Sequence, residues 1–160
     1  MTELYIYKNT VQQSWIDHNN HMHDAQYYSV FSDAVVGFFD SIDFTVSYRQ
    51  NQAVTIFSVE AHISFLKELL LDEAFYIKPY IYDYDQKRVH LFLTMYNLQN
   101  ERIATYEVIM MCVDNQTRRS TTFPKAIYEK IKSYFDKQQP FEIPKQLGHV
   151  IGIPKIKSNI

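Results

Sequence analysis

The residues from Trp15 to Asp24 include the side-chain types that hydrolytic chemistry requires. Asp17, Asn19 and His21 alternate along this polar stretch, which lies between a strand-like and a helix-like pattern. A carboxylate can act as a general base or as a nucleophile, and an imidazole can transfer protons near neutral pH. An amide can orient water or polarise a carbonyl, and unpaired N–H groups from His21 to Asp24 can stabilise an oxyanion. The stretch therefore has the groups needed to hydrolyse an activated acyl bond.

The same residues also have simpler explanations. Asn and Asp before a helix most often cap it, and histidines in loops are usually solvated, so composition alone favours capping. His21 and His23 could also bind a metal, but an H-x-H pair without a third ligand at a diagnostic spacing is weak evidence for a metal site. We therefore predict no metal, and the choice between capping and catalysis depends on the surrounding pattern.

The elements on either side of this stretch are predicted to be a strand and a long helix. Leu4–Val11 is rich in Tyr, Ile and Val, and Asp24–Ile42 repeats its apolar residues with a helical period. Two adjacent stripes contain Ala25, Tyr28, Phe31, Val35, Phe38 and Ile42, and Tyr27, Val30, Ala34 and Gly37. Because more than half of the helix circumference is apolar, we expect a sheet to wrap around it. The small residues Ala34 and Gly37 would let a strand approach closely.

Four strands are predicted after the helix and a polar stretch at Ser47–Gln52. Apolar and polar residues alternate with a period of two from Phe57 to Phe65. Three further strands are expected at Phe75–Tyr82, Arg88–Leu98 and Ile103–Asp114. The connections between the last three are short, which predicts antiparallel neighbours.

The C-terminal part is predicted to hold a second helix and a tail. Pro124 suits a first helical turn, and apolar residues at four-residue spacing extend the pattern to Lys137. Residues 138–160 contain three prolines and two glycines, so we expect an extended or partly disordered tail. The prediction is an α+β domain over residues 1–137, in which an antiparallel sheet of about five strands curls around the long helix. This arrangement resembles the hotdog fold.

The order D-x-N-x-H-M, followed by a helix with Tyr27, resembles the loop of hotdog acyl-CoA and acyl-ACP thioesterases, in the 4-hydroxybenzoyl-CoA thioesterase-like superfamily. The resemblance covers roughly residues 5–135 and is closest to the carnitine-dehydrogenase-associated and betainyl-CoA thioesterase branch. The matching residues are Trp15, Ile16, Asp17, His18, Asn19, Asn20, His21, Met22, Tyr27, Glu60, His62, Phe65, Glu68, Arg118, Arg119, Phe123 and Pro124. The resemblance implies functional roles for Asp17, Asn19 and His21, and for the acidic residue Glu68 after the following strand.

Two positions depart from that branch. Asn20 stands where glycine is usual, and Asn is the non-glycine residue that best tolerates a left-handed backbone. His23 stands where Asn is usual, which could alter capping, acyl specificity or both. We therefore place His23 and Tyr27 among the candidate substrate-binding residues.

Glu68, Arg118 and Arg119 also have alternative interpretations. An isolated glutamate such as Glu68 is more often solvated than catalytic. The basic pair Arg118 and Arg119 could hold the phosphates of coenzyme A, or could simply lie in a solvated turn. The two readings of the arginines are evenly balanced.

Composition narrows the function classes further. The net charge is −2 and the basic residues are scattered, which argues against nucleic-acid binding. The chain has one cysteine, Cys112, in an apolar run, which fits a buried thiol and a reducing cytoplasm. No apolar run approaches the ~20 residues of a membrane helix, and the N-terminus lacks a signal-peptide pattern.

We therefore expect an acyl-CoA thioesterase for a small or medium acyl group, with betainyl-CoA as one candidate. The alternatives are a non-catalytic acyl-CoA binder and a hotdog hydratase or dehydratase, although no segment resembles the His-Phe-Pro-Gly-type loop of the latter. No cofactor is expected beyond the coenzyme A of the substrate. A cytoplasmic homodimer or homotetramer is expected, because hotdog sheets commonly pair into one continuous sheet.

Overall fold

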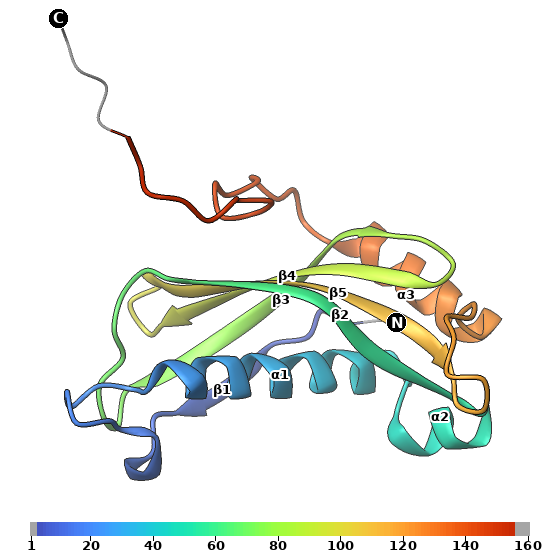
Figure 1. Cartoon of the computed structure of the whole chain (residues 1–160), viewed down its shortest axis with the longest axis horizontal. Coiled ribbons are helices and arrows are strands. Elements are labelled where there is room, and N and C mark those ends of the chain that lie inside the picture. Colours follow the sequence, from blue (N-terminus) through green and yellow to red (C-terminus); the bar gives the residue numbers. More distant parts are fainter. Residues whose placement is uncertain (1–2, 156–160) are drawn as a thin grey trace, which may run out of the picture.

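Five antiparallel strands form one curved sheet, and the long helix α1 lies along its concave face (Figure 1). The computed structural model describes residues 3–155. Its strands are β1 (Tyr7–Thr10), β2 (Val54–Phe65), β3 (Ala74–Tyr84), β4 (Arg88–Asn97) and β5 (Arg102–Asp114). Its helices are α1 (Asp24–Ser41), α2 (Val46–Asn51) and α3 (Lys125–Lys137), with a short 3-10 turn at Gln13–Trp15. The α+β hotdog fold expected from the sequence is confirmed.

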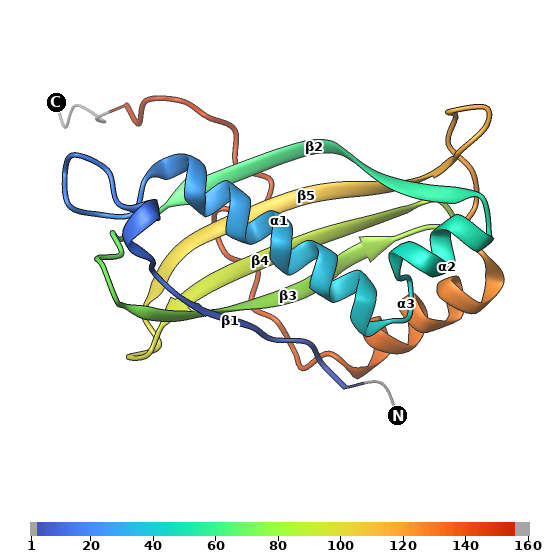
Figure 2. The same ribbon diagram turned by 90° about the horizontal axis from the view of Figure 1, so that it is seen from below.

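The strands lie in the order β1-β3-β4-β5-β2, so β1 and β2 form the two edges. Seen from the helix side, the two edge strands flank α1 (Figure 2). Register shifts interrupt the ladders between Ser58 and Glu60, Ile81 and Asp83, and Met95 and Tyr96. Such irregularities increase the local twist, which helps the sheet to curl around the helix.

Helix α1 buries most of the predicted apolar side against the sheet, but Ala25 and Tyr28 are exposed. Phe31 and Phe38 are completely buried, and Phe31 stacks on Tyr106 of β5 with ring centroids 5.2 Å apart. Burying such an aromatic side chain contributes roughly 1.5–3 kcal/mol.

Gly37 does allow a close approach to the helix, but by the side chain of Tyr5 rather than by a strand. A Cβ at Gly37 would lie 1.9 Å from the Tyr5 hydroxyl oxygen. The N-terminal segment therefore packs against α1 at this point.

Two local expectations differ from the structure. The polar stretch at Ser47–Gln52 contains helix α2, whose N-cap Thr45 accepts a hydrogen bond from the Tyr48 amide. Strand β1 is shorter than the predicted Leu4–Val11, because Tyr5 leaves the sheet direction and its amide donates to the hydroxyl of Tyr134 in α3. The first difference rests on a local capping contact, and the second on a contact with a distant part of the chain.

The tail after α3 crosses the convex face of the sheet (Figure 1). The Gln138 side-chain amide donates to the Ile81 carbonyl at 3.0 Å, and Phe141 stacks on Tyr80 with centroids 3.9 Å apart. The described part of the tail has no helix or strand and turns at residues 145–148, and residues 138–149 contact the sheet. The last five residues of the predicted tail, 156–160, lie outside the described residues.

Candidate active site

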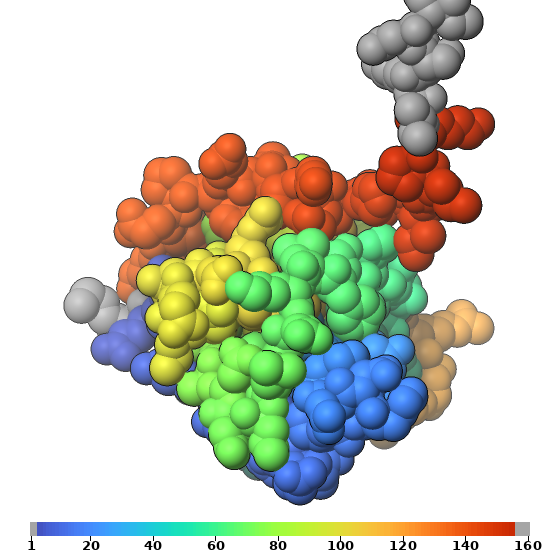
Figure 3. All heavy atoms as spheres, turned by 90° about the vertical axis from the view of Figure 1, so that its left-hand side faces the viewer, coloured from blue at the N-terminus to red at the C-terminus, as the bar shows by residue number. Residues whose placement is uncertain are grey.

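Residues 15–24, here called the acid loop, are joined to the loop of residues 66–73 that follows β2. The Met22 amide donates to the Leu69 carbonyl at 2.8 Å, and His21 and Leu70 form an isolated antiparallel bridge. In the end-on view, the blue surface of the acid loop lies against the green surface of the 66–73 loop (Figure 3). Two segments about 50 residues apart in the sequence therefore form one surface at the N-terminal end of α1.

The Asp17 carboxylate is held at the start of this surface, with its side chain 15% exposed. The Asn19 amide donates to Asp17 Oδ1 at 2.8 Å. Burial alone would raise the pKa of Asp17, but the amides of Asn19 and His21 and the imidazoles of His21 and His18 outweigh it. The pKa of Asp17 consequently lies below its ordinary value. Asp17 is therefore an ionised carboxylate at neutral pH, as a base or nucleophile must be.

The turn between Asp17 and His21 depends on two asparagines. Asn20 has a φ of 63°, the left-handed conformation that was predicted for it. The Asn19 side chain is exposed at the loop surface, while its backbone amide binds Asp17. Asn19 therefore holds the carboxylate through its main chain and leaves its side-chain amide available to a substrate or water.

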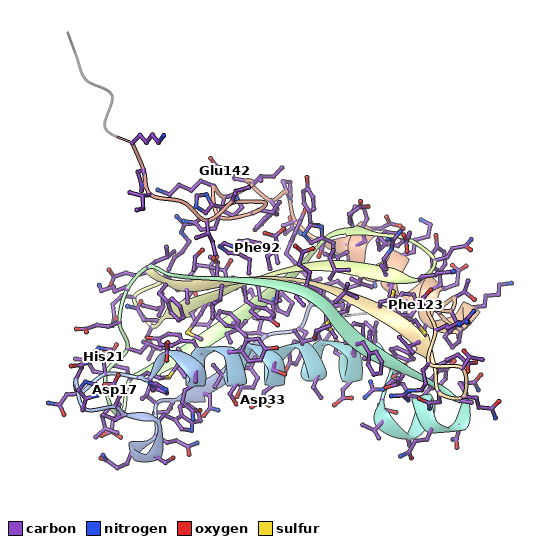
Figure 4. The ribbon with its side chains drawn as sticks, in the orientation of Figure 1. Asp17, His21, Asp33, Phe92, Phe123 and Glu142 are labelled. Atoms are coloured by element: carbon purple, nitrogen blue, oxygen red, sulfur yellow. The ribbon has the colours of Figure 1, made fainter. Side chains whose placement is uncertain are left out.

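Two histidines lie beside the carboxylate (Figure 4). Nδ1 of His21 is 3.9 Å from Asp17 Oδ2 and 3.2 Å from the Met22 carbonyl oxygen. A proton on Nδ1 would be donated to the Met22 carbonyl and would leave Nε2 of His21 as the unprotonated nitrogen. Nδ1 of His23 is 4.0 Å from Asp17 Oδ2 and 3.3 Å from the carboxylate of Asp24. The structure thus brings Asp17, His21 and His23 together.

The amides expected to form an oxyanion site are mostly occupied. Met22 N–H binds the Leu69 carbonyl, His23 N–H binds the Trp15 carbonyl, and Ala25 N–H binds the Asp24 carboxylate. Within residues 3–155, the Asp24 amide has no such acceptor. The expectation of a free run of amides from His21 to Asp24 is therefore wrong, because the Leu69 carbonyl of the 66–73 loop takes the Met22 amide and the Trp15 carbonyl of the acid loop takes the His23 amide.

Tyr27 and Glu68 flank the acid loop from α1 and the 66–73 loop. Tyr27 is buried, and its hydroxyl oxygen accepts a hydrogen bond from the Leu69 amide at 3.0 Å. Burial is the main cause of the raised pKa of Tyr27, and the charges of Glu68, Glu73 and Asp17 add to it. Glu68 is exposed. Tyr27 therefore positions the loop that carries Glu68, a role that its spacing in the sequence did not indicate.

Arg118 and Arg119 lie at the other end of the molecule. They follow β5 and precede Phe123, which packs near the C-terminal end of α1, whereas Asp17 precedes its N-terminus (Figure 4). The 18 residues of α1 span about 27 Å. Arg118 has a φ of 61°, and its guanidinium lies 5.2 Å from the centroid of Phe57 on β2. One chain alone does not bring the arginines to the acid loop.

A cleft between α1 and β2 was not predicted from the sequence. Its volume is about 220 Å³. It is lined by Ser32, Val35, Val36, Phe39, Arg49, Ile56, Ser58, Tyr106 and Met110. The exposed Tyr28 on α1 meets Tyr106 edge-to-face, with centroids 5.7 Å apart. The larger, shallow hollow outside β1 is about 630 Å³, and neither it nor the cleft contains a predicted site residue. The cleft is the candidate for an acyl group because it lies between α1 and the edge strand β2 and is lined by the ring of Tyr106.

Two further properties concern the part of the chain that the structure describes. Within residues 3–155 no three His, Cys, Asp or Glu side chains are grouped so as to hold a metal ion. None of the helices in this range is both long and apolar enough to cross a bilayer.

The fold and the acid loop together define a hotdog protein with a site suited to thioester chemistry. The chain belongs to the thioesterase-like superfamily, whose model matches residues 11–131. The resemblance read from the acid loop is thereby confirmed.

Named relatives agree with this assignment. The chain is 31% identical over 150 residues to an L-carnitine dehydrogenase/betainyl-CoA thioesterase of a Rhizobium species, covering 93% of this chain but 30% of that protein. It is 25% identical to a betainyl-CoA thioesterase of Pseudomonas aeruginosa, covering 96% and 98% of the two chains. A Staphylococcus aureus protein solved in complex with CoA has a TM-score of 0.93 and 44% identity, over 96% of this chain and 98% of that one.

Proposed function

We propose that the chain hydrolyses a small or medium acyl-CoA, betainyl-CoA among the candidates, to the free acid and CoA. The observation that carries the proposal is the ionised Asp17 carboxylate beside the His21 imidazole, 3.9 Å away, at a loop surface next to the N-terminus of α1. The named relatives support thioester chemistry, and the CoA complex of the S. aureus protein supports coenzyme A as the carrier.

In the proposed reaction, water adds to the thioester carbonyl carbon and the C–S bond breaks. Asp17 accepts a proton from the attacking water, and the proton is returned to the sulfur of the departing CoA, with His21 positioned to transfer it. The Asp24 amide at the positive end of the α1 dipole would stabilise the oxyanion. Asp17 could instead attack the carbonyl itself, giving a mixed anhydride that water then hydrolyses. Mass spectrometry of protein quenched during turnover distinguishes the routes, because only attack by Asp17 adds the acyl mass to the enzyme.

A homodimer through the free edge of β2 would complete the site. Strand β2 has 12 residues, and an unpaired edge of that length is a ready template for a second strand. Antiparallel pairing of β2 with its copy reverses the strand direction across the interface. The turn of Arg118 and Arg119 beside the start of one β2 would then approach the acid loop beside the end of the other. The partner's Arg118 and the partner's Arg119 would bind the CoA phosphates.

The acyl group would enter the cleft between α1 and β2 of one subunit and meet Asp17 of the partner subunit, because the cleft lies at the start of β2 and antiparallel pairing brings that part beside the other subunit's acid loop. Its volume of about 220 Å³ suits a short chain rather than a long one. Tyr28 and Tyr106 present aromatic rings near this cleft, and a quaternary ammonium is attracted to such rings. These rings support betainyl-CoA as a substrate.

The proposal includes no metal and no cofactor apart from the coenzyme A of the substrate. It also includes a cytoplasmic location, which the unpaired, buried thiol of Cys112 fits. Retention of full turnover after exhaustive dialysis against a chelator is expected, and loss that added metal restores would contradict the metal-free route.

The deciding experiment is thiol release from a panel of acyl-CoAs, including betainyl-CoA and straight chains of increasing length. We expect turnover of the short members and a decline as the acyl chain outgrows the cleft. If calorimetry detects binding of these esters without thiol release, the chain is a binder. If an enoyl-CoA gains water while its thioester survives, the chain is a hydratase.

A further inference from the structure

The tail over the convex face ends in an anchored turn. We call residues 138–149 the strap. Phe92 points from the convex face of β4 toward it, and Glu142 lies on it (Figure 4). At its end, the Gly148 amide donates to Glu107 Oε1 at 2.7 Å, while Glu107 Oε2 lies 2.7 Å from His90 Nε2. Gly148 has a φ of 69°, which favours glycine. The strap is therefore fixed to β5 up to Gly148.

The chain leaves the body of the protein immediately after the strap. His149 meets His62 of β2 edge-to-face, with ring centroids 6.0 Å apart. Beyond it, Val150, Ile151 and Ile153 are 84%, 83% and 91% exposed. We call Val150–Ile153 the arm. Figure 2 shows the end of the tail emerging beyond β2, on the side of the free edge. The anchored turn thus directs an apolar segment away from its own sheet.

The edge that the arm passes carries exposed apolar side chains, and the Arg118 guanidinium lies over one of them, Phe57. Strand β2 has one acidic residue, Glu60, and no Lys, Arg or Pro to prevent pairing with another strand. Phe57 and Val59 are 39% and 56% exposed on this strand. The exposed apolar residues of the arm and of β2 therefore lie on either side of the same edge.

We propose that the arm docks on β2 of a second copy of this chain, against Phe57 and Val59 of the partner subunit. The proposal rests on the β2-edge dimer included in the proposed function, and it adds a second, reciprocal contact to that dimer. If two β2 strands pair antiparallel about their midpoint, Val54 of one strand faces the end of the other. His62 then lies opposite Phe57 of the partner subunit. The arm, which leaves the molecule above His62, reaches that part of the partner.

The buried area supports a contact of this kind. Each of the three aliphatic side chains of one arm buries roughly 100 Å² of its own surface. A symmetric dimer has two arms, and each arm covers a similar area on β2 of the other subunit. The sum is on the order of 1,000 Å², compared with roughly 1,200–2,000 Å² in a stable interface. The arms would therefore supply a large part of what an edge-paired dimer needs.

Disulfide trapping between two different chains tests the docking. One chain carries Ile151→Cys, and a second, distinguishable by an affinity tag, carries Phe57→Cys. The native Cys112 is buried, and burial raises its pKa to about 11, so it does not compete. After mixing and mild oxidation, we expect a covalent heterodimer. The matched control replaces Phe57→Cys by Leu98→Cys, which is 66% exposed on the β4–β5 turn, and we expect no cross-link with it. Absence of the Phe57 cross-link, or equal trapping at Leu98, would overturn the proposal.

A second measurement distinguishes a failure of the arm contact from a failure of the dimer or of the thioesterase activity. In sedimentation equilibrium, we expect Ile151→Asp to raise the dissociation constant of the dimer at least tenfold. Leu98→Asp should leave that constant unchanged. An unchanged constant in Ile151→Asp would contradict the docking. If the wild type dimerises but the Ile151→Cys and Phe57→Cys chains give no cross-link, the arm proposal alone fails. If trapping succeeds but acyl-CoA releases no thiol, the proposed function alone fails.

Discussion

The hydroxyl oxygen of Tyr27 accepts a hydrogen bond from the amide of Leu69 at 3.0 Å. Tyr27 is in the first turns of α1, directly after the acid loop, and Leu69 is in the 66–73 loop that also carries Glu68. The bond therefore fixes the distance between the two chain segments that hold the acidic residues of the candidate site. The aromatic ring contributes as well, since it packs edge-to-face on Phe65 with centroids 5.3 Å apart.

Replacing Tyr27 by Phe should weaken both stability and catalysis. The change leaves the buried Leu69 amide without its acceptor, which costs about 1–3 kcal/mol of unfolding free energy. Because the two loops then move relative to each other, kcat should fall more than KM rises. Urea unfolding and steady-state kinetics measure the two effects. Tyr82→Phe, which removes a hydroxyl from an exposed side chain of β3, is the control and should change the unfolding free energy little.

Asp17 should stabilise the folded state at neutral pH and lose this contribution in acid. Its pKa is lower in the folded chain than its ordinary value, so its ionisation stabilises the fold above the unfolded pKa. This contribution is lost as the pH falls through the lowered pKa of the folded protein. We expect the stability difference between wild type and Asp17→Asn to be constant near neutral pH and to shrink in acid. A difference that grows toward low pH in urea titrations would contradict the assignment.

Gly37 should not tolerate a side chain while Tyr5 is present. An added Cβ would lie 1.9 Å from the Tyr5 hydroxyl oxygen, so Gly37→Ala should displace that ring and cost roughly 1–3 kcal/mol. The double variant with Tyr5→Ala should recover part of the loss, as a double-mutant cycle would reveal. Strictly additive losses would mean that the two residues do not interact.

The partner's arginines can be tested by complementation. Arg118→Ala with Arg119→Ala should raise KM for acyl-CoA, and Asp17→Asn should abolish most of kcat. In a mixed dimer of these two chains, one site has an intact Asp17 and the intact arginines of the other subunit. That site should regain the wild-type KM with about half of the wild-type kcat per dimer. No recovery on mixing would mean that the arginines serve the acid loop of their own chain, or none.

Local patterns predicted the fold well, because α1 and strands β2 to β5 have sequence periods that match their environments. The acid loop was also visible from residue order, and Asn20 has the predicted left-handed backbone. The strap was missed, because Gln138 and Phe141 are ordered by contacts with β3 that have no local signal. The occupied amide of Met22 was missed for the same reason, whereas the His23 amide is taken by Trp15 within the acid loop. Contacts between distant segments, or between chains, are what residue spacing does not encode.

The most direct test of the account is thiol release from short-chain acyl-CoAs by the wild type, Asp17→Asn and His21→Ala, each checked for folding by circular dichroism. The buried Cys112 should not contribute to a thiol-reagent signal at pH 8, because its pKa is raised to about 11. We predict turnover by the wild type, a loss of roughly 10²–10⁴-fold in kcat for Asp17→Asn, and a smaller loss for His21→Ala. Full turnover by a folded Asp17→Asn protein would contradict the assigned site.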